Sequence, residues 1–251
     1  MLSLATRARA LGRPLLLGHR GAKVGAIENT MSAFARARDA GADGIEFDVR
    51  ACASGELVVF HDADLARMAG RGEQISTMSW QQLAEVRIGN DERIPSLEQV
   101  LAEFHDGTFV LNIEIKLPLL AREVELVDGV LDAVARHGAG EQVVISSFNP
   151  RVVARVRRQA PGLACGYLFH QDEPEILQQA WRAPPARPYA VHPEHVLITP
   201  ARLQRWLQLG FAVVTWTVDR EPELQRLAEL GVHAIISNDP PFALEVLQRS
   251  V

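Results

Sequence analysis

The sequence predicts an α/β protein folded as a (β/α)₈ TIM barrel. Short apolar runs alternate with longer amphipathic segments from one end of the chain to the other, as strands and covering helices do. The chain has 251 residues, a usual length for eight strand–helix units. No glycine-rich phosphate loop follows an early strand, which disfavours an open dinucleotide-binding sheet.

Nine apolar runs are candidate strands, and several are apolar on both faces, as buried parallel strands are. They are Leu15–Leu17, Gly44–Val49, Leu57–Phe60, Val110–Ile115, Val143–Ser146, Gly166–Phe169, Tyr189–Val191, Val213–Val218 and Ala234–Ile236. Only eight residues separate Asp48 from Leu57, too few for a parallel crossover. One member of this pair is therefore expected to be an irregular or hairpin strand.

Amphipathic segments with helical spacing lie between these runs. Examples are residues 30–40, 97–104, 123–137 and 222–230. Thr30 is a suitable N-cap for the first of them, and Gly41, Gly138, Gly210 and Gly231 stand where helices are expected to end.

Residues 63–95 are rich in glycine and charge, and they are expected to form a short inserted loop with one helix around residues 80–86. The rest of the chain contains neither an internal repeat nor a clear linker. Residues 1–251 are therefore expected to form one domain.

Charge, apolar segments and cysteine spacing limit the partners and the cellular location that this chain is expected to have. The formal net charge is −5, which disfavours a nucleic-acid or anionic-membrane surface, because both require a basic face. The longest early apolar run is too short for a signal peptide, and no stretch reaches a membrane span, so we expect a cytoplasmic protein without stable membrane association. Cys52 and Cys165 lack the spacing of a thiolate metal site and are expected to be buried and reduced.

Polar and charged residues stand at every second position of two candidate strands. Glu46 and Asp48 project to one face of their strand, and Asn112, Glu114 and Lys116 share one face of another. Carboxylates that converge at a barrel mouth repel one another unless a cation lies among them. An all-oxygen set suits Mg²⁺ or Ca²⁺. The alternative is that each acid forms an ion pair with a neighbouring arginine or lysine.

Two histidines stand at the ends of apolar runs, where a barrel places catalytic residues. His19 and His61 are each followed by a charged residue, and histidine is the usual general acid or base near neutral pH. The remaining histidines lack this context and are expected at the surface or in packing, although His192 also ends a run.

Together these groups suit one reaction. A divalent ion with Arg20 and Lys116 would neutralise a phosphate and the charge that builds on it during displacement. One histidine would deprotonate the attacking oxygen, and the other would protonate the leaving alkoxide. This combination predicts phosphodiester hydrolysis.

At this point the sequence resembles the glycerophosphodiester phosphodiesterases, in their cytosolic bacterial form. The motifs that carry the resemblance stand in the family's order and are His19-Arg20-Gly21, Glu28-Asn29-Thr30, Glu46-Phe47-Asp48, His61-Asp62, Asn112-Ile113-Glu114-Ile115-Lys116 and Ser146-Ser147-Phe148. Further likeness runs through Ile94–Glu98, Thr215–Val218 and Ile236–Pro240, so it spans the chain from about His19 to Pro240.

The resemblance implies metal-dependent hydrolysis of glycerophosphodiesters to sn-glycerol 3-phosphate and an alcohol on a TIM barrel. By position, the catalytic acid/base pair corresponds to His19 and His61, the metal ligands to Glu46, Asp48 and Glu114, and the phosphate-binding cations to Arg20 and Lys116.

The resemblance also implies a substrate pocket that contains Trp216, Glu28 and Phe148. Trp216 corresponds to an aromatic residue near the glycerol group, with a plain core tryptophan as the alternative. For Glu28, metal-binding, orienting and structural roles all stay open. The segment Ser237-Asn238-Asp239 departs from the family's threonine before the aspartate, and little functional weight is expected there.

Two other functions compete with this one. A lysophospholipase D-like enzyme would act on single-chain lipids, and Met68, Met78, Trp80 and Leu83 could line an apolar groove for them. A non-catalytic phosphodiester-binding barrel would lack a histidine or a metal carboxylate, and this sequence has all of them. The choice between Mg²⁺ and Ca²⁺, the alcohol and the oligomeric state stay open.

Overall fold

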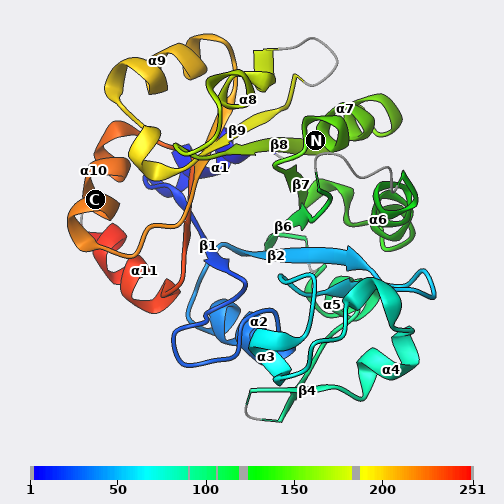
Figure 1. The fold of residues 1–251 in the computed structure, drawn as a ribbon. Helices are drawn as coiled ribbons and strands as arrows, with labels where there is room; N and C mark the ends of the chain where they lie inside the picture. The colour runs from blue at the N-terminus through cyan, green and yellow to red at the C-terminus, as the bar shows by residue number, and fades with distance from the viewer. Residues whose placement is uncertain (1–2, 90, 106, 119–123, 183–186, 250–251) are drawn as a thin grey trace.

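The structure is a computed structural model that describes residues 3–89, 91–105, 107–118, 124–182 and 187–249. Within these residues, eight parallel strands pair side by side, and the first pairs with both the second and the last, so that the sheet closes into a barrel (Figure 1). Helices surround the sheet, which confirms the predicted TIM barrel.

The barrel strands follow the predicted runs closely. They are β1 (Leu15–His19), β2 (Gly44–Ala51), β6 (Val110–Ile115), β7 (Val143–Ser147), β8 (Ala164–Phe169), β9 (Ala190–Pro193), β10 (Ala212–Thr215) and β11 (Ala234–Ser237). The largest difference is at β10, which was expected to reach Val218 and ends at Thr215, where the chain turns into the mouth of the barrel.

The one predicted run that is not a barrel strand, Leu57–Phe60, forms β3 (Leu57–Val59), which pairs antiparallel with β2 outside the barrel. The predicted hairpin strand is therefore confirmed. The short link between β2 and β3 permits only this antiparallel return.

The principal helices agree with the predicted segments to within two residues. All the α-helices among the described residues are α1 (Leu4–Leu11), α2 (Met31–Asp39), α3 (Ala66–Ala69), α4 (Trp80–Ala84), α5 (Leu97–Phe104), α6 (Val124–Arg136), α7 (Pro150–Gln159), α8 (Glu175–Gln178), α9 (Pro200–Gln208), α10 (Glu221–Leu230) and α11 (Pro240–Arg249). Thr30 caps α2 as expected, because its side chain accepts a hydrogen bond from the Ala33 amide. Glu123, the first residue of the predicted 123–137 helix, lies outside the described residues.

The interior of the barrel is apolar at one end and polar at the other. Leu15, Leu17, Val110, Val144 and neighbouring small residues fill the end at which the strands begin. Further along the same strands, alternation brings Glu46, Asp48, Asn112 and Glu114 to the inner face. The strand register therefore gathers polar groups at the carboxyl ends of the strands.

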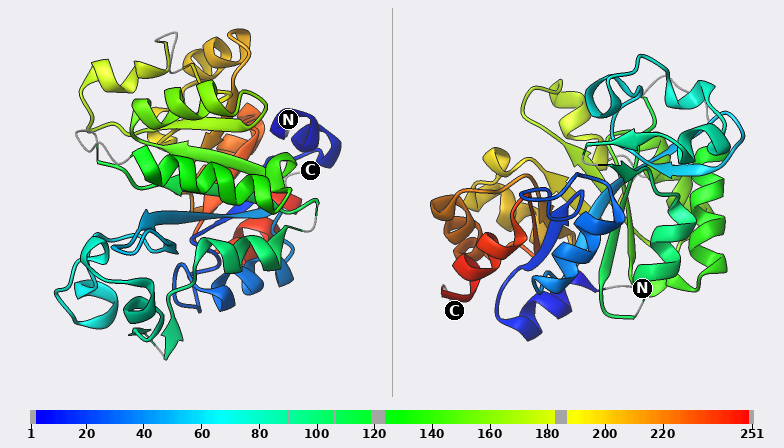
Figure 2. Two further views of the ribbon diagram at one scale, coloured as in Figure 1. Left: turned by 90° about the vertical axis from the view of Figure 1, so that its right-hand side faces the viewer. Right: turned by 90° about the horizontal axis from the view of Figure 1, so that it is seen from below.

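Helix α1 closes the apolar end of the barrel. Leu4 is buried with the interior residues, and its amide donates a hydrogen bond to the Tyr189 hydroxyl. Ser3 caps this helix. In Figure 2 (left), α1 and the segment after β3 lie at opposite ends of the barrel.

Residues 63–95 are more ordered than the predicted loop with one helix. They contain α3, α4, the 3₁₀ helix η1 (Ile75–Thr77) and a small hairpin of β4 (Arg87–Ile88) and β5 (Glu92–Arg93). Leu65, Ile75, Leu83 and Ile88 share a buried cluster with Val58 from β3. This insertion therefore has its own small core beside the mouth of the barrel.

Close approach of two strands makes Gly44 a stability determinant. A Cβ atom at this position would lie 2.2 Å from the carbonyl oxygen of Val110, so the backbone would have to shift. We expect Gly44→Ala to destabilise the protein by about 1–3 kcal/mol in denaturant unfolding, as overpacking does. Gly162→Ala is the matched control, since nothing lies within 4 Å of its added Cβ, and equal losses for the two variants would contradict the steric argument.

Candidate active site

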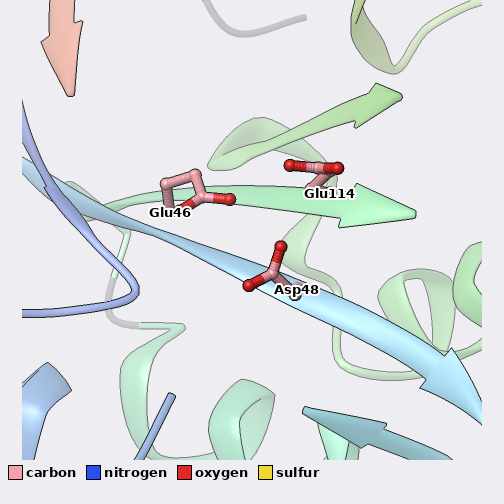
Figure 3. Close-up of side chains that lie close together, drawn as sticks. All are labelled: Glu46, Asp48 and Glu114. Atoms are coloured by element: carbon pink, nitrogen blue, oxygen red, sulfur yellow. The ribbon is translucent and has the colours of Figure 1, made fainter. Parts of the chain in front are cut away.

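Three carboxylates from two neighbouring strands converge at the mouth of the barrel. Glu46 and Asp48 on β2 and Glu114 on β6 point toward one another (Figure 3). One oxygen of each lies within 4.8 Å of the others, and all three side chains are buried. This is the convergence that the alternation of the two strands predicts.

The charges of this acidic cluster are poorly balanced. Burial raises the pKa of Glu46 well above its ordinary value, and the negative charges of Asp48 and Glu114 raise it further. Burial also raises the pKa of Glu114, against the opposing effect of Lys116. Hard oxygen ligands that are costly to keep charged together are suited to a divalent cation. The cluster could therefore hold a metal ion.

Two cations lie against the cluster. Lys116 Nζ is 3.0 Å from Asp48 Oδ1 and 2.5 Å from Glu114 Oε1, and Arg20 Nε is 3.2 Å from Asp48 Oδ2. Burial opposes the charged form of Asp48, but Lys116 and Arg20 outweigh it and hold the pKa of Asp48 well below its usual range. Within the described residues, Arg20 Nε and Asp48 Oδ1 form no properly directed hydrogen bond, so each keeps unused polar capacity.

His19 ends β1 and is held by residues from the opposite end of the chain. Its Nδ1 lies 2.6 Å from Asn238 Oδ1, and Asn238 in turn donates to Asp219 through its side-chain amide, at 2.5 Å. An amide oxygen only accepts, so His19 Nδ1 carries the proton, and Nε2, which lies 3.9 Å from Glu46 Oε2, is the nitrogen with the lone pair. Burial, helped by the charge of Arg20, lowers the pKa of His19 to about 4.

His61 follows β3 and contacts a carboxylate. Its Nδ1 lies 2.8 Å from Asp62 Oδ1, and Arg50 donates to the His61 carbonyl oxygen through Nε at 3.0 Å. Burial lowers the pKa of His61, against the opposing effect of Asp48. The ring is half-buried, so a proton can reach it from the mouth of the barrel.

His19 and His61 line one pocket of about 170 Å³ together with acids and cations of the cluster. Phe148 and Trp216 form an apolar wall of this pocket, with ring centroids 5.4 Å apart in an edge-to-face pair. Trp216 Nε1 donates to the His192 carbonyl oxygen, which fixes the orientation of the indole. The pocket thus has a charged side and an aromatic side.

Glu28 has a different place from the one expected. It does not line this pocket but lies behind Arg20, and its carboxylate accepts hydrogen bonds from Arg20 Nη1 at 2.8 Å and Arg67 Nη2 at 2.6 Å. Among the roles that the sequence left open, this geometry favours the orienting one.

The other notable histidine is His192, inside the barrel. It is fully buried, and its ring packs so closely on Gly166 that a Cβ there would lie 2.2 Å from Nε2. Burial lowers the pKa of His192 to about 3, so the ring is neutral. This matches the packing role expected for the histidines outside the two motifs.

Sequence reasoning missed the partners that orient the site. Asn29 donates to Asp48 Oδ2 at 2.8 Å, and it adopts a left-handed conformation with φ +56°, which asparagine tolerates. Asn238, from a segment to which little functional weight was given, binds His19. The signal for Asn29 was its place inside the Glu-Asn-Thr motif. Arg67 had no comparable local signal.

Comparison with known proteins identifies the family. The sequence profile of the "Glycerophosphoryl diester phosphodiesterase family" matches residues 19–241, nearly the range over which the motifs stand in order. The chain belongs to this family.

Relatives agree with the family assignment. A glycerophosphodiester phosphodiesterase of Caldanaerobacter subterraneus subsp. tengcongensis is 31% identical over 244 residues, covering 94% of this chain and 99% of the relative. The crystal structure of a glycerophosphodiester phosphodiesterase from Thermotoga maritima superposes with a TM-score of 0.77 at 26% identity, covering 93% of this chain and 98% of that one.

The same fold is found in a phosphodiesterase of Oleispira antarctica, solved in complex with the product sn-glycerol-3-phosphate. It has a TM-score of 0.83 at 22% identity and covers 96% of this chain and 99% of that one. The family model and the Caldanaerobacter relative confirm the predicted family and enzyme class, and the closed barrel confirms the predicted fold. In the part of the chain that the structure describes, no helix is both long and apolar enough to cross a bilayer.

Proposed function

We propose that this protein hydrolyses glycerophosphodiesters to sn-glycerol 3-phosphate and an alcohol, with a divalent cation and two histidines. The observation that carries the proposal is the single pocket lined by His19, His61, Arg20, Lys116 and the carboxylates of the acidic cluster. Family membership and the product bound to the Oleispira relative support the same substrate class.

The metal ligands would be Glu46, Asp48 and Glu114. Their all-oxygen chemistry fits Mg²⁺ or Ca²⁺, and the raised pKa values of Glu46 and Glu114 indicate that a dication would relieve repulsion within the cluster. When bound, such an ion supplies electrophilic stabilisation of the charge that develops on the phosphate oxygens.

His19 is suited to the role of general base. Its lowered pKa keeps the ring neutral at neutral pH, and its bond to Asn238 leaves Nε2 as the lone-pair nitrogen. Nε2 would accept the proton of the attacking hydroxyl, which belongs to water or to the 2-position of glycerol. The bond between that oxygen and phosphorus would then form.

His61 is suited to the complementary role of general acid. Burial lowers the pKa of His61, but the charge of Asp48 and the Asp62 carboxylate beside Nδ1 oppose this effect and favour the protonated ring, and the mouth of the barrel allows exchange of its proton. As the bond from phosphorus to the alcohol oxygen breaks, His61 would protonate the leaving alkoxide. Arg20 and Lys116 would hold the phosphate, since both line the pocket. Arg20 Nε forms no hydrogen bond among the described residues, and Lys116 Nζ lies between Asp48 and Glu114.

Trp216 and Phe148 would contact the carbon skeleton of the glycerol group. Both are half-buried aromatic residues on the apolar wall of the pocket, where flat apolar surface suits the CH groups of a polyol. The charged side of the pocket would then receive the phosphate, so the two walls together would orient the substrate. The cytoplasmic location stays a prediction from the sequence.

The lysophospholipase D-like alternative rests on an apolar groove in the insertion. Met78 and Leu83 instead pack in the core of the insertion, so they do not line a groove, and half-buried Met68 lines a separate pocket with Ile27 and Phe242. The function proposed here therefore favours a water-soluble glycerophosphodiester.

An assay over metals and substrates tests the proposal. We expect release of glycerol 3-phosphate from glycerophosphocholine with Mg²⁺ or Ca²⁺ and its loss when a chelator removes the ion. Turnover of lysophosphatidylcholine should be at least about tenfold slower, which corresponds to roughly 1.4 kcal/mol in the barrier. Full activity in the presence of chelator would contradict the metal site, and preference for the lipid would favour the alternative function.

A further inference from the structure

A chain of ion pairs joins the catalytic face of the pocket to the insertion. Arg67 in α3 donates through Nε to Asp62 Oδ2 at 2.7 Å and through Nη2 to Glu28 Oε1 at 2.6 Å. Asp62 holds His61, and Glu28 holds Arg20. One guanidinium therefore contacts both carboxylates that orient the proposed acid and the proposed phosphate ligand.

The surroundings of this guanidinium make it a well-placed anchor. Glu28 and Asp62 are largely shielded, with side chains 12% and 23% exposed, so their charges need a partner. Burial opposes ionisation of Asp62, yet the bonds from Arg67 and His61 keep its pKa below the usual range. Arg67 lies on the short helix α3, which begins directly after Leu65, a fully buried residue of the insertion core.

We propose that Arg67 is a positioning residue through which the insertion holds Asp62 against His61 and so selects the His61 tautomer with the proton on Nδ1. With Nδ1 held protonated against Asp62, Nε2 is the nitrogen that carries the proton given to the leaving alkoxide, and the Nδ1-protonated tautomer is the neutral ring that remains after the transfer. The inference rests on the proposed function for its effect on turnover, but its structural part concerns only the state of the His61 ring.

The charge balance explains why this positioning depends on an arginine. Without the guanidinium, Asp62 would keep only His61 as its ion-pair partner within the described residues, and Oδ2 would lose the partner that fixes the carboxylate. The planar fork of arginine serves two carboxylates at once, whereas a lysine ammonium serves them as a point charge. Arg20 keeps its separate ion pair with Asp48, so the phosphate site is affected less than His61.

The test compares Arg67→Gln, Arg67→Lys and Asp62→Ala with the control Arg71→Gln. Arg71 belongs to the same insertion and pairs with exposed Glu73 at 2.6 Å. We expect Arg67→Gln to lower kcat for glycerophosphocholine by about tenfold or more, as loss of a group that orients a functional histidine does, with a KM change below about threefold. Arg67→Lys should recover part of kcat, and Arg71→Gln should match the wild type.

Two further measurements separate positioning from a merely structural effect. In ¹⁵N spectra of histidine-labelled protein, with the His61 signal assigned from His61→Ala, the Nδ1-protonated tautomer should dominate in the wild type and lose population in Arg67→Gln. In a double-mutant cycle, adding Arg67→Gln to Asp62→Ala should lower kcat by less than about twofold, because both changes remove one interaction.

Unchanged His61 spectra in Arg67→Gln, or fully additive losses in the cycle, would overturn the inference. Thermal unfolding of each variant shows whether the fold is kept, and the exposed position of Arg67 makes a large loss of stability unexpected. Failure of the proposed function gives a different result, since His61→Ala would then stay active while the ¹⁵N spectra still report the effect of Arg67.

Discussion

Replacing either His19 or His61 with alanine is expected to lower kcat by about 10²–10⁴-fold, the usual contribution of a general acid or base. Each ring lines the same pocket and has its Nδ1 held by a partner, Asn238 for His19 and Asp62 for His61. Removal of a ring therefore leaves either the attacking hydroxyl without a base or the leaving alkoxide without an acid. The measurement is steady-state release of glycerol 3-phosphate at saturating metal.

Folding should survive both substitutions. The two rings lie at the mouth of the barrel and not in its apolar interior, so circular dichroism and thermal unfolding should be close to wild type. His105→Ala is a suitable control, because that ring binds the Leu101 carbonyl oxygen on α5, away from the pocket. Near-normal turnover by either site variant would refute the two-histidine mechanism.

Glu46→Gln is expected to have opposite effects on stability with and without metal. In the metal-free protein, burial and the charges of Asp48 and Glu114 disfavour ionised Glu46, so a neutral side chain of equal size should raise the melting temperature near neutral pH. With a divalent ion in excess, the wild type should gain about 2.7 kcal/mol at 100 times its Kd, and the variant should gain far less. The variant should therefore be the more stable protein without metal, and the wild type the more stable one with metal.

The pH dependence has a definite sign. Because the pKa of Glu46 is higher in the folded protein than its ordinary value of 4.5, the folded state binds more protons than the unfolded state above that pH. Metal-free wild type should lose stability as the pH rises from about 4.5 through the folded pKa, and Glu46→Gln should lose less.

Activity and a surface control complete this test. Glu46→Gln should lose metal-dependent turnover by at least about tenfold, whereas Glu103→Gln changes only an exposed partner of Arg38. Calorimetric unfolding with Mg²⁺, with Ca²⁺ and with chelator provides the comparison. Equal metal stabilisation of wild type and Glu46→Gln would show that the acidic cluster does not hold the ion.

The strands and the acidic cluster were predictable because their signals are local. Alternation places Glu46 and Asp48 on one face whatever surrounds the strand, and parallel pairing then places Glu114 beside Asp48. The hairpin strand β3 was predictable for a similar reason, since a short link excludes a crossover.

Other features depend on distant contacts. Helix α1 buries only Leu4 and Ala8, and its role becomes clear only from the contact of Leu4 with the barrel interior and Tyr189. The insertion has a core because Leu65, Ile75 and Leu83 meet Val58 from another segment, not because any run of it is strongly apolar.

The sequence by itself determined the barrel, the family and the set of chemical groups at its mouth, since short-range periodicity and ordered motifs specify these. Only the tertiary structure decided how those groups are oriented. Asn238 reaches His19 across the closure of the barrel, and Arg67 reaches Glu28 from the insertion. Such pairings join positions far apart in the chain, and a hydrogen bond depends on distance and angle in space, which no local pattern of residues encodes.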